Sequence, residues 1–273
     1  MRLSISNFAW NPELDEAVAA CLNSFGVSAI DIAPGKYFSD LEKITTGDIN
    51  KIAEWWHQKN IDIVGMQGLL FGAPGLNIFG DKKSQDALIK RLESICRIGR
   101  ILRATRLVFG SAKNRDRSGL SDSEAFDIAV PFFKRLGDVA GKYDVVVCLE
   151  PNPPLYGANF MTTFTETANI VKAVDCDTIK MQLDIGACAI NQEDINDHLA
   201  QNSHLIGHIH ASEPQLLPLG SGGVDHSVSG AAIHRYLPHH IVTIEMLTAN
   251  YKNPLAIIGS AVEHALKYYM IED

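Results

Sequence analysis

The chain has 273 residues, of which 46% are hydrophobic, and its 24 Lys and Arg are outnumbered by 32 Asp and Glu, which gives a net charge of −8. The hydrophobic share provides for a large buried core and excludes an intrinsically disordered chain. The acidic balance, without a cluster of basic residues, argues against a nucleic-acid partner, because neutralising phosphates requires clustered Lys and Arg.

No segment of the sequence resembles a targeting or membrane segment. The first residues lack the apolar run of a signal peptide, and no stretch approaches the roughly 18 uninterrupted apolar residues that span a bilayer. The five cysteines are scattered and form no CxxC motif, which is typical of reduced thiols. We therefore expect a cytoplasmic protein that does not associate with membranes.

Short apolar runs typical of strands alternate with longer amphipathic runs typical of helices along the whole chain. The predicted strands cover residues 3–8, 28–32, 61–67, 106–110, 145–150, 179–184, 205–210 and 241–245. A predicted helix follows each strand, and these helices cover residues 11–25, 46–59, 83–104, 121–143, 163–174, 191–201, 226–237 and 254–269. Ser121 followed by Glu124 forms a capping-box pattern at the start of one of them.

The eight strand–helix pairs predict the fold class. Alternating strands and helices form parallel sheets, and no linker or change of composition divides the chain. No GxGxxG motif follows the first strand, which argues against an open dinucleotide-binding sheet. The length is close to the roughly 250 residues of a (β/α)₈ barrel. We predict an α/β protein in which residues 1–273 form a single (β/α)₈ TIM barrel.

Ionisable residues end four consecutive predicted strands. Glu150, Asp184, His210 and Glu245 each follow an apolar run, in VVVCLE, MQLD, IGHIH and VTIE. Strand ends converge at the carboxyl end of such a barrel, where active sites lie. Three carboxylates brought together repel one another, and a divalent cation would offset that repulsion. Three oxygen ligands with one imidazole suit Mn²⁺, Mg²⁺, Co²⁺ or Zn²⁺, so we predict one divalent ion here.

These residues lie in motifs that resemble the xylose-isomerase-like barrel superfamily of sugar isomerases and epimerases. The similar stretches occur in order along essentially the whole chain, and they are CLEPNP (148–153), QLDIGA (182–187), GHIHASE (207–213), GSGGVDH (220–226) and VTIEML (242–247).

The resemblance implies a function as well as a fold. It implies that Glu150, Asp184, His210 and Glu245 bind one divalent metal, and that Glu150 and Glu245 also transfer a proton on either face of a sugar or sugar-like polyol. The reaction would pass through a metal-stabilised enediolate. The expected partner is a small carbohydrate substrate, and a homo-oligomer is possible.

The sequence departs from the ketose 3-epimerases of this superfamily at two positions. A His usually follows the metal-binding Asp by three residues and an Arg follows the metal-binding His by six, but here these positions are Ala187 and Leu216. Both groups help to hold the sugar in those enzymes, so a different substrate or a loss of the reaction is implied. Glu213 remains at its expected position as a substrate ligand.

Several polar residues near the strand ends are further candidates. Gln67, Asn152 and His226 are predicted to contact substrate hydroxyls, with loop or helix capping as the alternative. His208 is expected to be a buried, hydrogen-bonded residue of the barrel interior. Arg115, like the nearby Lys113, is interpreted as a solvated loop charge, with recognition of a phosphate or carboxylate as the alternative.

Three other functions fit parts of the pattern. A sugar-acid or cyclitol dehydratase would use the same metal site and the same proton abstraction, and the sequence does not separate it from an epimerase. A barrel that binds a metabolite without turnover is compatible with Ala187. An apurinic-site endonuclease, which occurs in the same superfamily, is disfavoured, because it needs a His-rich metal cluster and a basic DNA-binding face.

Overall fold

A closed barrel of eight parallel strands forms the centre of the protein. The computed structural model describes residues 1–270, and the strands follow one another round the barrel in sequence order, with β1 paired to β8. The strands are β1 (Arg2–Ser6), β2 (Ala29–Ile32), β3 (Asp62–Met66), β4 (Arg106–Phe109), β5 (Val146–Leu149), β6 (Ile179–Asp184), β7 (Ile206–Ser212) and β8 (Ile241–Glu245).

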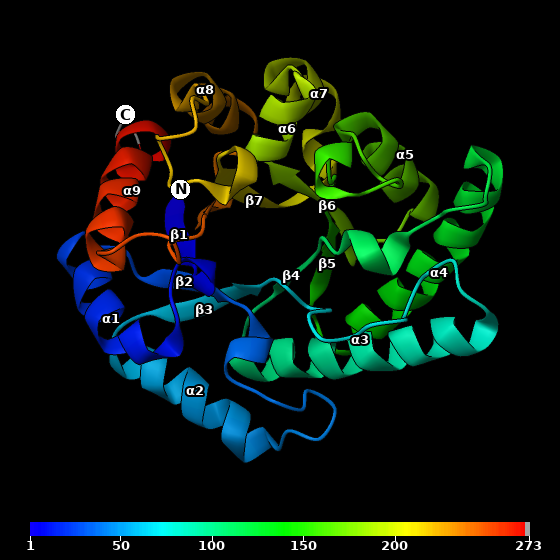
Figure 1. Ribbon diagram of the computed structural model, residues 1–273, viewed down its shortest axis with the longest axis horizontal. Helices are drawn as coiled ribbons and strands as arrows, with labels where there is room; N and C mark the ends of the chain where they lie inside the picture. Colours follow the sequence, from blue (N-terminus) through cyan, green and yellow to red (C-terminus); the bar gives the residue numbers. More distant parts are fainter. Residues whose placement is uncertain (271–273) are drawn as a thin grey trace.

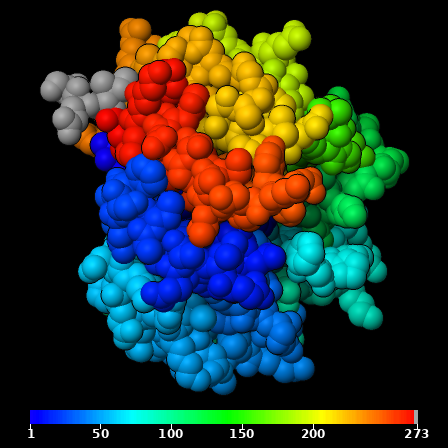
Figure 2. Space-filling model, turned by 60° about the vertical axis from the view of Figure 1, so that its left-hand side comes forward, coloured from blue at the N-terminus to red at the C-terminus, as the bar shows by residue number. Residues whose placement is uncertain are grey.

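The helices surround this barrel as an outer ring (Figure 1). They are α1 (Asp15–Ser24), α2 (Thr46–Gln58), α3 (Lys82–Leu102), α4 (Asp122–Lys142), α5 (Phe164–Val174), α6 (Ile185–Asn191), α7 (Ile195–Asn202), α8 (His226–Tyr236) and α9 (Pro254–Tyr269). Short 3₁₀ helices lie in the connections, namely η1 (Asn7–Ala9), η2 (Pro12–Leu14), η3 (Pro34–Lys36), η4 (Ala112–Arg115), η5 (Pro154–Tyr156), η6 (Ser203–Leu205) and η7 (Pro214–Leu216). On the face shown in Figure 2, α9 lies between α8 and α1, which closes the ring where the chain begins and ends.

The predicted fold class is confirmed, and two local predictions are wrong. A helix, α6, begins directly after β6, where the sequence analysis expected a loop, because Asp184 caps it by accepting a hydrogen bond from the backbone N–H of Ala187. Strand β7 continues to Ser212, so His210 lies inside the strand rather than at its end. The capping box of Ser121 and Glu124 is present at the start of α4.

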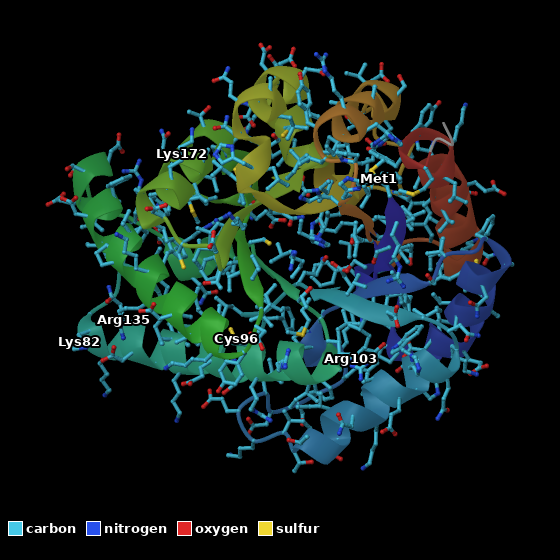
Figure 3. The ribbon with its side chains drawn as sticks, turned by 180° about the vertical axis from the view of Figure 1, so that it is seen from behind. Met1, Lys82, Cys96, Arg103, Arg135 and Lys172 are labelled. Carbon is cyan, nitrogen blue, oxygen red and sulfur yellow. The ribbon has the colours of Figure 1, made fainter. Side chains whose placement is uncertain are left out.

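Burial on both sides explains the strand sequences. The side chains on the outer face of the strands pack against the helices, and those on the inner face fill the barrel, so continuous apolar runs suit both environments. Figure 3, seen from behind, shows side chains that project into the interior of the ring. Within residues 1–270, none of the helices is both long and apolar enough to cross a membrane.

Candidate functional site

The four ionisable residues that the sequence analysis placed at strand ends lie together at the carboxyl end of the barrel. Asp184 and Glu245 are the last residues of β6 and β8, Glu150 follows β5, and His210 is in β7. One oxygen or nitrogen atom of each lies within 4.8 Å of the other three. We call Glu150, Asp184, His210 and Glu245 the strand-end cluster.

His210 lies at the centre of the strand-end cluster. Its Nδ1 is 3.4 Å from Glu150 Oε1, 3.3 Å from Glu245 Oε2 and 3.8 Å from Asp184 Oδ2. The imidazole is fully buried, and the three carboxylates are largely so. Three carboxylates and one imidazole therefore face one another within the reach of a single ion.

Neighbouring residues hold two of the carboxylates in place. Gln67 Nε2 donates a hydrogen bond to Glu245 Oε1 over 2.6 Å. Ser212 Oγ donates to Asp184 Oδ2 over 2.9 Å, and the Ala187 N–H donates to Asp184 Oδ1 over 2.6 Å. Such supporting contacts fix ligand orientation in metal sites.

The free atoms and the charge balance of the strand-end cluster fit a cation. Glu150 Oε1 and both ring nitrogens of His210 are buried and have no hydrogen-bond partner among the described residues, although buried polar atoms are rarely left unpaired. Burial, together with the charges of Glu245 and Glu150, raises the pKa of Asp184 to about 8. The site therefore carries more negative charge than its own groups offset, as expected of a cation-binding cluster.

Two residues of the loop after β4 constrain Glu150. A Cβ atom added at Gly110 would fall on the Glu150 carboxylate, so a larger residue there would force this carboxylate to move. Arg115 Nη1 donates to the backbone oxygen of Glu150 over 2.7 Å. The expectation that Arg115 is a solvated loop charge is wrong, because its side chain is fully buried, and burial lowers its pKa to about 10. Its position in a polar loop gives no sequence signal for this burial.

A second polar group lies one layer closer to the amino ends of the strands. His208 Nε2 is 2.6 Å from Asp31 Oδ2, Ser4 Oγ donates to Asp31 Oδ1 over 3.2 Å, and Thr243 Oγ1 is 3.3 Å from His208 Nε2. We call Ser4, Asp31, His208 and Thr243 the interior cluster. All four are buried, as expected of His208, and sequence analysis did not single out Asp31, which lies within an apolar strand with no motif around it.

The three carboxylates of the strand-end cluster line a cavity of about 1030 Å³ at the carboxyl end of the barrel, and His210 lies buried behind them. Three of the predicted substrate contacts, Gln67, Asn152 and Glu213, line this cavity. Gln67 Oε1 and Asn152 Oδ1 are buried atoms without a hydrogen-bond partner among the described residues, and Asn152 is held by a 2.6 Å hydrogen bond from its Nδ2 to the Gly110 oxygen. Both amides therefore keep a free acceptor at the cavity.

Two of the predicted contacts, Glu213 and His226, bind to each other. His226 Nε2 is 3.1 Å from Glu213 Oε1, and His226 Nδ1 is 2.6 Å from Tyr269 Oη. Glu213 also accepts hydrogen bonds from the backbone N–H groups of Gly220 and Val224, and it lines the cavity, whereas His226 lies outside the lining. In the structure they hold the glycine-rich loop, and a substrate role for either stays a prediction.

Comparisons with known proteins agree with this architecture. The solved structures most similar in fold include D-psicose 3-epimerase from Clostridium cellulolyticum H10 (TM-score 0.80, 17% identity, 99% of this chain and 98% of that chain covered). They also include 3-keto-D-glucoside 4-epimerase from E. coli (TM-score 0.78, 16% identity, 96% and 98% covered). A third is the IOLI protein with a bound zinc atom (TM-score 0.76, 18% identity, 98% of each chain covered).

A search of curated proteins found no match. A comparison of the sequence with family models did find one, because the model described as xylose isomerase-like TIM barrel matches residues 19–268, which is most of the chain. The protein therefore belongs to the xylose isomerase-like TIM barrel family.

Proposed function

We propose that this protein is a divalent-metal-dependent isomerase or epimerase of a sugar or sugar-like polyol. The observation that carries the proposal is the strand-end cluster, in which four donors with unpaired buried atoms converge and three carboxylates line a large cavity. The names of similar structures support it, since two are sugar epimerases and a third holds zinc.

Glu150, Asp184, His210 and Glu245 would hold the ion, and their donor set suits Mn²⁺, Mg²⁺, Co²⁺ or Zn²⁺. When bound, the ion would supply positive charge next to the carbonyl and hydroxyl oxygens of the substrate.

Glu150 and Glu245 are the proposed proton-transfer pair. They extend from β5 and β8, which are separated by two other strands of the barrel, so they approach the cavity from different directions. One carboxylate would take a proton from the carbon next to a carbonyl, and the other would return a proton to it. Gln67 fixes Glu245 for this task, and the free acceptor atoms of Gln67 and Asn152 would receive hydrogen bonds from substrate hydroxyls.

Incubation of the Mn²⁺-loaded protein with ketoses, sugar acids and inositols in D₂O tests the proposal. We expect deuterium to enter at least one substrate without loss of water. Loss of water would instead identify a dehydratase, and no uptake by any compound would favour a binding protein, so either result contradicts the proposal. Metal analysis of the same sample should find about one divalent ion per chain, in line with one cluster of this donor set.

Glu245→Gln tests the role of the proton-transfer pair. We expect exchange to fall by about 10²–10⁴-fold, the range typical of a lost general base. Glu263→Gln, at an exposed position of α9, is the matched control and should keep full exchange. Retained exchange in Glu245→Gln would refute its role, provided that the variant unfolds at the same temperature as the control.

A further inference from the structure

Most of the exposed large hydrophobic side chains lie at one end of the barrel. Within residues 1–270 nine such side chains are exposed, and six of them belong to connections that leave the carboxyl ends of strands. These six are Phe71, Leu155, Tyr156, Leu217, Leu247 and Tyr251. Exposed apolar surface that is gathered in one place marks an interaction site.

Four of these side chains lie on connections that contact one another. Because α6 begins directly after β6, no loop separates the connection after β5 from the connection after β7. The Gln215 N–H donates to Tyr156 Oη over 2.6 Å, and the Leu247 N–H donates to the Leu216 oxygen over 2.9 Å. The connections after β5, β7 and β8 therefore form one surface. We call its exposed side chains, which are 38–64% exposed, the apolar strip: Leu155, Tyr156, Leu217 and Leu247.

The connections that carry the apolar strip contain no charged residue. None of residues 151–165, 214–224 and 246–251 is Asp, Glu, Lys, Arg or His, although 21% of the chain is charged. Charged residues are depleted in the same way at the core of protein–protein interfaces. The apolar strip therefore has the composition of an interface core.

The absence of charge favours a second copy of the chain as the partner. The net charge is −8, so two copies repel one another where their acidic surfaces meet. In a two-fold symmetric contact the same surface lies on both sides, and a charge near the axis would face its own copy. An uncharged strip avoids this repulsion. A different partner protein is commonly selected by complementary charges, and the sequence of these connections offers none.

The apolar strip borders the cavity. Tyr156 lines the cavity together with Gln215 and Leu216, whereas the other three side chains of the strip do not line it. A partner that covers the strip would extend the wall of the cavity outward. Exclusion of water from an active site strengthens the electrostatic interactions inside it, so such a wall would aid proton transfer at the strand-end cluster.

We propose that the protein forms a two-fold symmetric homodimer through the apolar strip, and that each copy extends the outer wall of its partner's cavity. Formation of the dimer does not depend on the proposed function. The effect of the dimer on the reaction rests on the proposed function and extends it.

Analytical ultracentrifugation over a wide range of protein concentrations tests the dimer. The parent should change from monomer to dimer as its concentration rises. Leu155→Glu and Leu217→Glu should each weaken self-association by at least about 100-fold, because like charges would face each other across the contact. Phe126→Glu, at an exposed position of α4 outside the strip, is the matched control and should stay within about threefold of the parent. Near-ultraviolet circular dichroism checks that each variant is folded.

A parent that stays monomeric at every concentration would overturn the proposal and leave the apolar strip to a different partner. A dimer that survives both strip substitutions would also overturn it. Amide hydrogen exchange on the parent gives a test without substitutions, because amides of residues 214–224 should exchange more slowly in the dimer than in the monomer. Equal protection of these amides in both states would place the contact elsewhere.

Deuterium uptake by the substrate tests whether the dimer serves the cavity. At a concentration where the parent is dimeric, Leu155→Glu should lower the rate of uptake by about tenfold, although Leu155 does not line the cavity. An unchanged rate in this variant would refute the contribution of the partner to the wall. The two proposals fail separately, because a dimer that catalyses no uptake removes the proposed function alone, and a fully active monomer removes this inference alone.

Discussion

The interior cluster and the strand-end cluster are adjacent layers of buried polar residues inside one barrel, and they differ in how their atoms are satisfied. In the interior cluster Asp31 and His208 bind each other, with Ser4 and Thr243 at the remaining sides. In the strand-end cluster both nitrogens of His210 lack a hydrogen-bond partner among the described residues.

This difference indicates a structural role for the interior cluster and suits the strand-end cluster to binding a cation. Burial alone would raise the pKa of Asp31, but the charge and hydrogen bond of His208 outweigh it and lower that pKa below its ordinary value. At Asp184 burial and two neighbouring carboxylates act in the same direction and raise the pKa. The carboxylate of the interior cluster is compensated by its own histidine, whereas the strand-end cluster has uncompensated carboxylates that could hold a cation.

The largest expected effect is a loss of folding stability when the interior cluster is broken. His208→Ala leaves the Asp31 carboxylate buried without its partner, which should lower the free energy of unfolding by about 3–5 kcal/mol. Urea denaturation of the metal-free protein measures it. His204→Ala, at an exposed position, is the control and should stay within about 0.5 kcal/mol of the parent. A loss below about 1 kcal/mol for His208→Ala would mean that the interior cluster is not a structural pair.

The matching change in the strand-end cluster should act on metal binding. His210→Ala removes a central donor, and we expect Mn²⁺ affinity to fall by more than about 100-fold, since even lost supporting residues cost about 10–100-fold. Calorimetry on both His variants provides the comparison, and His208→Ala should remain within about tenfold of the parent. Equal losses of Mn²⁺ affinity in the two variants would contradict the prediction that the strand-end cluster, and not the interior cluster, binds the metal.

Gly110→Ala tests whether the position of Glu150 matters. The added methyl group would displace the Glu150 carboxylate, so Mn²⁺ affinity should fall by about 10–100-fold, as for other changes that misplace a ligand. Gly35→Ala is the control, because a Cβ there meets no atom within 4 Å. Unchanged affinity in Gly110→Ala would contradict the expectation that metal binding depends on the position of the Glu150 carboxylate.

The raised pKa of Asp184 predicts a pH dependence of metal binding. Below a pH of about 8 this carboxyl holds a proton in the metal-free protein, and a cation must displace that proton. Mn²⁺ affinity should therefore rise by up to about tenfold per pH unit toward pH 8 and level off above it. Titrations across this range measure the slope, and a flat profile would contradict a protonated Asp184.

The smallest expected effect lies on the outside of the helical ring. Lys82 on α3 and Arg135 on α4 both contact Asp86, and Figure 3 shows the two basic residues near each other at the periphery. Arg135→Ala should change the free energy of unfolding by less than about 1 kcal/mol, because exposed ion pairs contribute little. A larger loss, measured by urea denaturation, would show that ion pairs on the surface of the helical ring contribute to the free energy of unfolding as much as the interior cluster does.

The sequence predicted the barrel and the residues at its carboxyl end, because both follow from local patterns. Apolar runs that stop at Glu150, Asp184 and Glu245 reveal the strands and the polar positions together, and closure of the barrel brings those positions to one place. His210 was found by the same pattern although β7 continues two residues beyond it.

The remaining features depend on packing between distant segments, which one sequence does not display. The buried Arg115 donates to the carbonyl of Glu150, the residue that follows β5, and Asp31 is paired because His208 of β7 reaches it from across the barrel. Likewise, the sequence offered Glu213 and His226 as substrate contacts, while their link to Tyr269 depends on the last helix folding against α8.

The most direct test of the central claim is an anomalous difference map, recorded at the manganese edge, from crystals of the protein soaked in Mn²⁺. The account predicts one strong peak bound by Glu150, Asp184, His210 and Glu245. No peak at these residues, or a peak between Asp31 and His208 instead, would contradict it.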